Sequence, residues 1–209
     1  MSVEPPHVPV GAGWRRVEES VDTPFDVRVV TVTAATRVWE DETTQRAIRE
    51  SADVDRTWRF FFATRIVLRP ASRPSKALRA VVTDRALDGF EDRLRDRGFE
   101  SVARRESREF SVGEERATLA RHEAVSRVAA LDASLAVEGY AAVWPVGNEF
   151  RLAGGAYPTG VRTAGGDGGR NAAADANERD ADERVARVHE ALEPERFRTD
   201  LLELIRRVE

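Results

Sequence analysis

The stretch "ASLAVEGYAAVWPVGNEFRLAGGAY", residues 133–157, decides the fold class that we expect for this chain. Two apolar segments lie on either side of Pro145-Val146-Gly147-Asn148. Proline favours the start of a tight turn, and glycine tolerates the positive φ that such turns need. The stretch therefore predicts a β-hairpin, with one strand before the turn and one after it.

A second hairpin is predicted just upstream. Residues 99–112 ("FESVARRESREFSV") lead through Gly113-Glu114 into residues 115–128 ("ERATLARHEAVSRV"). Consecutive hairpins form an antiparallel meander. We therefore expect four antiparallel strands in succession.

Two further strands are predicted nearer the N-terminus, over residues 27–40 and 57–70. Residues 27–40 are rich in Val and Thr, which favour strands. In residues 57–70 the side chains alternate, so that Trp58, Phe60 and Phe62 share one face. We expect that face to lie in the core.

Helical spacing predicts a long helix over residues 75–97. Apolar residues recur every three or four positions along it, Ser75 is a suitable N-cap, and Gly98 follows the last turn. The apolar stripe is expected to contain Leu78, Val81, Val82, Ala86, Phe90 and Leu94. A short helix is predicted over residues 40–52.

A closing helix is predicted after Pro194, a residue that suits a first helical position. Its apolar stripe consists of Phe197, Leu201, Leu204, Ile205 and Val208. Because so short a helix is marginal alone in water, it must dock on the domain. We expect it to cover the face of Trp58, Phe60 and Phe62.

These elements predict one α+β domain with a central antiparallel sheet covered by helices, over residues 14–157 and 182–209. Residues 1–13 contain three prolines and two glycines and are expected to form a flexible arm. Residues 158–181 are rich in Gly, Ala, Asn and Asp and have almost no large apolar side chain. Such a segment buries too little surface to offset its ordering entropy, so we predict a disordered insertion.

The composition narrows the class of protein. The chain has 209 residues, a net charge of −4 and no cysteine, which excludes disulfides and thiolate metal sites. A charge so close to zero makes a nucleic-acid partner unexpected. No basic and apolar leader opens the sequence and no apolar segment has the length of a membrane span, so we expect a cytoplasmic protein with no membrane partner. Lys76 is the only lysine among 33 basic residues, which suggests a GC-rich genome and a halophilic archaeon.

Gly154 and Gly155 raise the question of a phosphate-binding loop. Such a loop needs backbone amides at a helix N-terminus, and the Walker form also needs Gly-Lys-Ser/Thr. Here the glycines lie in a predicted strand and no such motif follows. We therefore expect them to permit a bulge, or the close approach of another element such as the closing helix.

His122, Glu138 and Tyr140 are the candidates for acid–base chemistry, because by parity they can share one face of neighbouring strands. Glu123 is expected to point away from His122. Chance proximity on an exposed sheet is the ordinary alternative. The sequence has no HExxH spacing and no Gly-x-Ser-x-Gly elbow, so we assign no catalytic, cofactor-binding or metal-binding residue and expect no cofactor.

The hairpin over residues 99–128 is dense in arginine. Its arginines are Arg104, Arg105, Arg108, Arg116 and Arg121. A basic surface suits an acidic partner or nucleic acid, with Arg104, Arg108 and Arg121 as candidate contacts. Glutamates interleave with these arginines, however, so cross-strand salt bridges are the expected use.

The order of elements resembles that of the PsbP-like fold family over roughly residues 57–208. The resemblance rests on the helix ending in Gly98-Phe99, on "ESVARRESREFSVGEERATLARHEAV", on "LAVEGYAAVWPVGNEFRLAGGAYP" and on the closing "PERFRTDLLELIRRVE". It implies an antiparallel sheet between helical layers, in an α/β/α sandwich. None of that family's metal or partner residues can be matched here, and its early Pro-x-x-Trp strand is missing.

The resemblance and the lack of catalytic motifs lead to one expected role. We expect a non-enzymatic binding or assembly module with a protein or a small ligand as its partner. The alternative is a small-molecule enzyme that uses the sheet face around His122. A third possibility is a nucleic-acid-associated protein that uses the arginine-rich hairpin.

Overall fold

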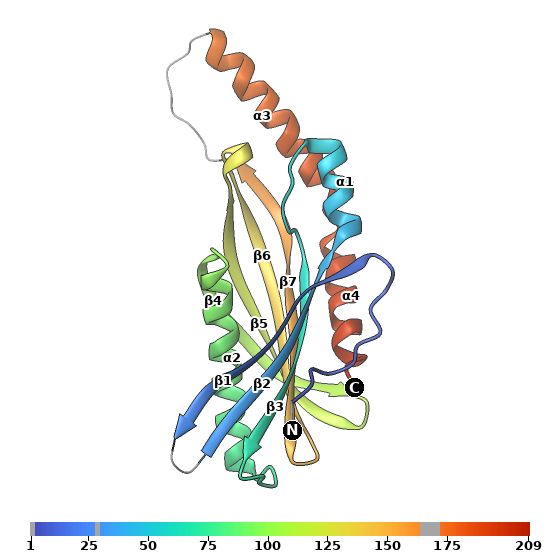
Figure 1. The fold of residues 1–209 in the computed structure, drawn as a ribbon. Coiled ribbons are helices and arrows are strands. Elements are labelled where there is room, and N and C mark those ends of the chain that lie inside the picture. Colours follow the sequence, from blue (N-terminus) through green and yellow to red (C-terminus); the bar gives the residue numbers. More distant parts are fainter. Residues whose placement is uncertain (1–2, 28–29, 164–171) are drawn as a thin grey trace.

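The computed structural model describes residues 3–27, 30–163 and 172–209. In this part of the chain, seven strands form one antiparallel sheet (Figure 1). They are β1 (Trp14–Val27), β2 (Val30–Asp41), β3 (Phe60–Arg69), β4 (Glu100–Val112), β5 (Glu115–Val128), β6 (Ala133–Val146) and β7 (Glu149–Thr163). The predicted fold class, a single α+β domain with a central antiparallel sheet, is confirmed.

The strands follow the order β1-β2-β3-β7-β6-β5-β4. β4 to β7 form the predicted meander, and the turn glycines Gly113 and Gly147 have φ values of +58° and +59°. Pro145 differs from its predicted place in a turn, since it lies in β6 and pairs with Phe150. β3 pairs with β7, which joins the N-terminal strands to the meander.

The N-terminal strands are longer than the sequence indicates. The sequence analysis begins the domain at residue 14 but predicts no strand before residue 27, whereas β1 runs from Trp14 to Val27. β1 is an edge strand, and Val17 and Val21 are exposed on it. A strand with so little burial has no strong apolar alternation, so its pattern is weak.

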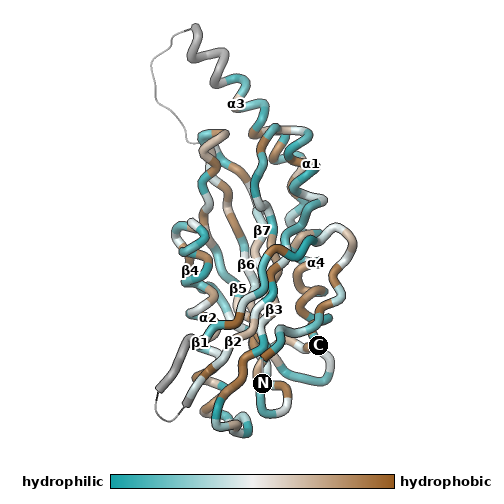
Figure 2. The backbone as a smooth tube through the Cα atoms, viewed as in Figure 1, coloured by the Kyte–Doolittle hydropathy of each residue, from teal (hydrophilic) through white to brown (hydrophobic). Residues whose placement is uncertain are grey.

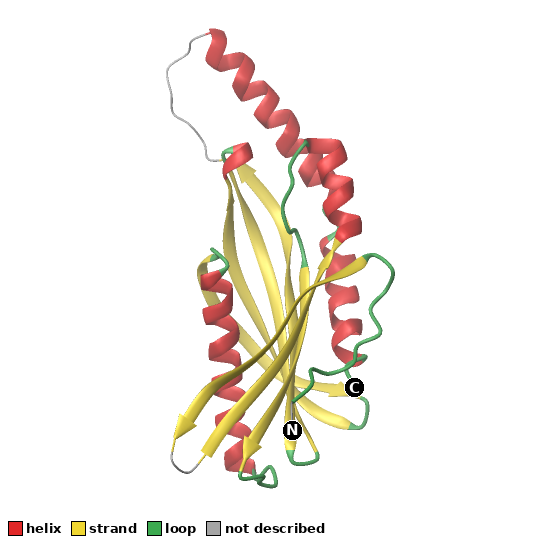
Figure 3. Ribbon diagram, in the orientation of Figure 1, coloured by secondary structure: helices red, strands yellow, loops and turns green. Residues whose placement is uncertain are grey.

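Four α-helices accompany the sheet in the described residues: α1 (Glu42–Ala52), α2 (Lys76–Asp96), α3 (Ala172–Ala191) and α4 (Pro194–Arg206). A short 3-10 helix, η1 (Ala129–Leu131), connects β5 and β6. Figure 3 shows α2 on one side of the sheet and α1, α3 and α4 on the other. α2 covers only the lower part of its side in this view.

α2 begins and ends where the sequence indicates. Ser75 Oγ accepts from Leu78 N at 3.2 Å, and Gly98 has a φ of +82°. The buried positions are Leu87, Phe90 and Leu94, all in the second half of the helix. Leu78, Val82 and Ala86 are partly buried against the core, as the predicted stripe requires. Val81 is 59% exposed, so its place in that stripe is wrong.

α4 docks on the face opposite to the predicted one. Phe62 stacks on Phe90 of α2, with 5.4 Å between the ring centroids. Phe61 points the other way and pairs with Gly155, which lies against Leu201 of α4. Since neighbours in a strand alternate, Trp58, Phe60 and Phe62 lie on the α2 side. Both faces of β3 are therefore buried.

The N-terminal arm is attached to the domain, which corrects the prediction of a flexible segment over residues 1–13. Val8 is buried, and the backbone carbonyl of His7 accepts from Glu209 N at 3.1 Å. Arg37 Nη1 donates to the carbonyl of Pro6. The arm contributes apolar side chains to the core, and these outweigh its proline and glycine content. Residues 1–2 lie outside the described part.

The predicted disordered insertion over residues 158–181 also needs correction. Residues 158–163 continue β7, where Pro158 pairs with Val137 and Thr163 with Ala133. Residues 172–181 belong to α3, which continues to Ala191. Backbone pairing extends the strand without requiring large side chains. Residues 164–171 lie outside the described part of the chain.

The described helices carry many polar residues. Figure 2 shows hydrophilic colour along much of the described part of α3. No described helix is long and apolar enough to cross a membrane.

Candidate functional site

His122 lies inside the domain, between β5 and α2. Its side chain is 0% exposed, and its ring meets that of Phe90 edge-on at 5.0 Å. Glu91 Oε1 lies 3.5 Å from His122 Nε2. Glu123 points to the other face, where it contacts Arg121, as predicted. A molecule outside the domain therefore cannot contact this imidazole.

The surroundings of His122 favour its neutral form. Burial lowers the pKa of His122 to about 4, the Glu91 carboxylate opposes this shift, and the Arg104 guanidinium adds to it. Within the described residues, neither ring nitrogen makes a hydrogen bond of good geometry. His122 is thus an enclosed neutral group rather than a base that faces a substrate.

Glu138 and Tyr140 lie on the other face of the sheet, so the predicted trio with His122 is wrong. β5 and β6 pair Arg121 with Tyr140 and His122 with Gly139. Paired residues of an antiparallel sheet point to the same side. His122 therefore lies under α2, and Tyr140 and Glu138 lie on the side of α4 with Arg121. A register difference of one residue exchanges the faces, which explains the error.

Glu138 is the centre of a polar cluster on the α4 side. Tyr157 Oη donates to Glu138 Oε2 at 2.5 Å, and Arg121 Nη1 lies 3.0 Å from Glu138 Oε1. Burial raises the pKa of Tyr157, and the Glu138 carboxylate raises it further. The same two causes raise the pKa of Tyr140. Both phenols therefore remain protonated at neutral pH, and the carboxylate already has two partners.

The arginine-rich hairpin divides its side chains between the two faces. Arg104 turns towards α2 and lies 2.7 Å from Asp88 and 2.9 Å from Glu91. Arg108 packs over the ring of Phe110, 5.8 Å from its centroid. Cross-strand ion pairs join Arg105 to Glu123, Arg116 to Glu109 and Arg121 to Glu138, which confirms the predicted salt bridges. Most of this positive charge is therefore neutralised within the domain.

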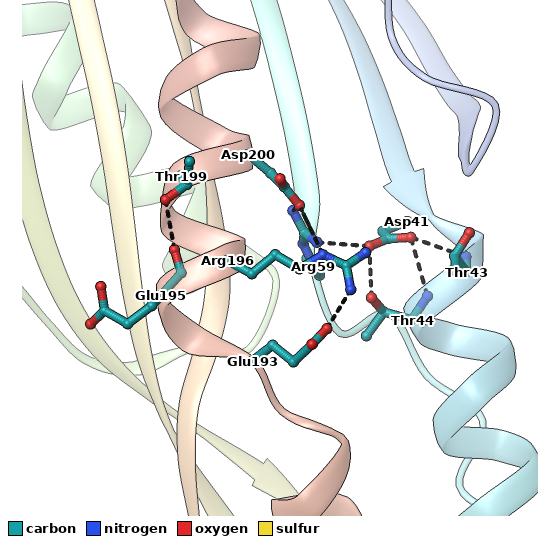
Figure 4. A network of polar contacts seen from close by, with 9 residues as sticks. All are labelled: Asp41, Thr43, Thr44, Arg59, Glu193, Glu195, Arg196, Thr199 and Asp200. Atoms are coloured by element: carbon teal, nitrogen blue, oxygen red, sulfur yellow. Dashed lines mark hydrogen bonds and ion pairs between the residues drawn. The ribbon is translucent and has the colours of Figure 1, made fainter.

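Figure 4 shows a buried ionic network that the sequence analysis missed. Arg59 is only 3% exposed, and its Nη1 lies 3.0 Å from Asp41 Oδ2 and 3.3 Å from Asp200 Oδ2. The guanidinium also stands over the rings of Phe197 and Trp14, at 4.3 and 5.0 Å. An arginine directly before the buried residues that begin β3 is the signal that could have revealed it.

The network joins helices to strands. Asp41 accepts from the backbone amides of Thr43 and Thr44 and thereby caps the start of α1. Asp200 belongs to α4, and Arg59 directly precedes β3. Because every charged group in it is paired, the network acts as a structural connection between α1, α4 and the sheet.

Open space lies on the α2 side, around the C-terminal end of that helix. Three hollows of about 270, 460 and 490 Å³ occur there. The first and second share Phe60 and Arg97, and the second and third share residues 127–129. We call the three together the sheet groove. His122 lines none of them.

The middle hollow of the sheet groove combines aromatic rings with guanidinium groups. It lies between residues 54–60, the end of α2 and η1. Its walls contain Trp58, Phe60, Phe99, Arg56, Arg97 and Arg127. Arg56 stands 5.5 Å from the centroid of the Trp58 ring, and Arg97 stands 4.8 Å from that of Phe60. Trp58 is 5% exposed, and its Nε1 has no acceptor among the described residues.

The sequence places Trp58 in the core, and its burial agrees. What the sequence does not reveal is that this core residue forms the wall of a hollow. In the described part of the chain, no group of three or more His, Cys, Asp or Glu side chains is placed to hold a metal ion.

Residues 3–209 match the family model of a domain of unknown function, DUF6517. The chain belongs to the DUF6517 family. No curated protein and no solved structure matches it significantly. The similarity of its element order to the PsbP-like proteins therefore stays a prediction. The sheet groove, the Glu138 cluster and the Arg59 network all lie within the part of the chain that defines the DUF6517 match.

Proposed function

We propose that the protein is a non-enzymatic binding module and that the sheet groove receives a small ligand. The observation that carries this proposal is the middle hollow of about 460 Å³, with its rings of Trp58, Phe60 and Phe99. Small-molecule sites are concave, mostly apolar and equipped with a few polar groups. The hollow has this composition, and the indole N–H of Trp58 has no acceptor within the described residues.

The other polar clusters give less support to a binding or catalytic role. His122 is enclosed, and the carboxylate of Glu138 is occupied by Tyr157 and Arg121. Several arginines of the hairpin over residues 99–128 are paired with carboxylates. The cytoplasmic location and the archaeal, halophilic origin expected from the sequence belong to the same proposal, but ligand binding does not depend on them.

A bulky side chain in the groove tests the proposal. Ala129 is exposed and lines both the middle and the third hollow, so Ala129→Trp fills space that a ligand needs. Ala80→Trp places the same bulk on an exposed position of α2 that lines none of the three hollows. The probe is phenylnaphthylamine, a neutral aromatic dye whose fluorescence rises in apolar sites.

We expect saturable dye binding by the wild type and by Ala80→Trp, and a loss of at least about tenfold in affinity for Ala129→Trp, since a filled pocket cannot hold the ring. Thermal unfolding of both variants checks that they are folded. Equal binding by Ala129→Trp, or no saturable binding by the wild type, rejects the groove as the ligand site.

A further inference from the structure

Arg56 carries a partly buried positive charge without a carboxylate partner in the described part of the chain. Among the described residues, burial leaves three arginines, Arg56, Arg59 and Arg151, with a pKa below the usual value. Arg59 pairs with Asp41, and Arg151 Nη1 lies 3.2 Å from Glu149. The groups that Arg56 contacts are instead neutral: two backbone carbonyls, a serine hydroxyl and an indole ring. This sets it apart from the other two arginines.

The side chain of Arg56 is held by neutral acceptors. Its Nη1 donates to the carbonyl of Arg127 at 3.0 Å, and its Nη2 donates to Ser126 Oγ at 2.8 Å. Nε donates weakly to the carbonyl of Thr57, at 3.4 Å. These bonds fix the guanidinium at the wall of the middle hollow without neutralising it. A half-buried charge without a counter-charge is costly, so a negative group nearby is stabilised.

The other charged residues that line the middle hollow are mostly positive as well. Arg97 and Arg127 also line it, while Asp55 is its one acidic lining residue, and Asp55 Oδ1 accepts from Gln45 Nε2 at 2.8 Å. The outer arginines have exposed partners: Glu100 is 3.0 Å from Arg127, and Glu18 is 3.5 Å from Arg97. Such exposed ion pairs are weak and can exchange for a ligand. The lining thus has an excess of positive charge beside aromatic rings.

Resting on the proposed function, we infer that the ligand of the sheet groove is a small organic anion, with one acidic group near Arg56 and a planar apolar body against Trp58 and Phe99. Guanidinium groups form strong hydrogen bonds with carboxylate, sulfonate and phosphate oxygens. The rings accept an apolar body by stacking or edge contact. The volume of about 460 Å³ suits a molecule of two or three rings.

Two dyes that differ only in an acidic group provide the test. Phenylnaphthylamine is neutral, and anilinonaphthalene sulfonate is the same ring system with a sulfonate. We expect the wild type to bind the sulfonate about tenfold more tightly than the neutral dye at equal ionic strength, because one charge-assisted hydrogen bond contributes about that factor. The ratio of the two affinities removes effects that are common to both dyes.

Three variants assign the preference to one residue. Arg56→Gln should bring the affinity ratio close to one, while Arg56→Lys, which keeps the charge, should retain most of it. Arg85→Gln changes the net charge equally at an exposed position of α2 outside the three hollows, and should leave the ratio unchanged. If circular dichroism shows that Arg56→Gln is unfolded, Arg56→Met, which also removes the charge, replaces it and should bring the affinity ratio close to one.

The outcomes separate the two proposals. Groove-dependent binding of the neutral dye with no preference for the sulfonate overturns the anion inference and leaves the proposed function intact. A preference that persists in Arg56→Gln, or that Arg85→Gln removes, also overturns the inference. Failure of both dyes to bind rejects the proposed function itself.

Discussion

Gly155 of β7 lies directly under Leu201 of α4. A Cβ placed on Gly155 would stand 3.0 Å from Leu201 Cδ1 and 2.1 Å from the carbonyl oxygen of Phe60. The glycine therefore lets the closing helix and β3 approach β7 more closely than any other residue permits. The expectation from the sequence, that Gly154-Gly155 serves close packing, is confirmed at this position.

Gly155→Ala should destabilise the fold by about 1–3 kcal/mol, because the backbone of β3 or the helix must move to admit the methyl group. Gly160→Ala is the matched control, because Gly160 also belongs to β7 and a Cβ placed on it would meet no atom within 4 Å. Urea denaturation of both variants measures the difference. If the two variants unfold at the same midpoint, α4 does not pack as tightly on β7 as the structure shows.

Leu201→Ala should cost about 2–5 kcal/mol, the loss typical of a buried leucine. Leu201 is 2% exposed. Arg206→Ala should cost only about 0.5–1 kcal/mol, since Arg206 is exposed but stands over the ring of Phe110 at 4.6 Å. Chemical denaturation of both variants, analysed with one common m-value, measures the two losses in the free energy of unfolding. A wild-type midpoint for Leu201→Ala would mean that α4 is not part of the core.

The meander and α2 could be predicted because their signals are local. The glycines at 113 and 147 mark tight turns, and Ser75 and Gly98 mark the ends of one helix. β1 could not be predicted with the same rules: it is an edge strand with little apolar alternation, and, unlike the edge strand β4, no glycine marks a tight turn between it and the next strand. Proline and glycine content predicts a flexible N-terminal arm, but Val8 is buried and the neighbouring carbonyl of His7 accepts from the backbone amide of Glu209, at the other end of the sequence.

The candidate sites were harder because they depend on register and on distant neighbours. The register between β5 and β6 pairs Tyr140 with Arg121 and not with His122, so His122 and Tyr140 lie on different faces of the sheet. The charge of Arg56 becomes notable only when the surrounding side chains are known to be neutral. A sequence shows which residues are charged but does not show which of them lack a partner.

Arg59→Met should destabilise the domain by about 3–5 kcal/mol, because it leaves the buried carboxylate of Asp41 without its cation. The double variant with Asp41→Asn should lose less than the sum of the two single variants, since it removes the orphaned charge as well. Arg15→Met is the control: Arg15 pairs with Glu42 at 2.6 Å but is 52% exposed, so its loss should cost under about 1 kcal/mol. Additive losses in the double variant would contradict a direct Asp41–Arg59 interaction.

The pH dependence of stability should report on His122. Burial lowers the pKa of its imidazole from 6.5 to about 4, with Glu91 and Arg104 as the charged groups that face it. Between these two values the unfolded chain binds a proton that the folded chain does not, so the free energy of unfolding must fall as the pH decreases. The free energy of unfolding should therefore fall gradually from about pH 6.5 down to about pH 4, by about 3 kcal/mol in total, and His122 should cause no further loss below that range.

Urea denaturation at a series of pH values measures how steeply the free energy of unfolding depends on pH. His122→Gln should flatten this slope. His7→Gln, which changes a 71% exposed side chain, should leave it unchanged. NMR titration of the ring provides a second measurement that does not depend on a variant that folds. A His122 pKa near 6.5 in the folded protein, or an unchanged slope in His122→Gln, would show that the imidazole is not enclosed as the structure places it.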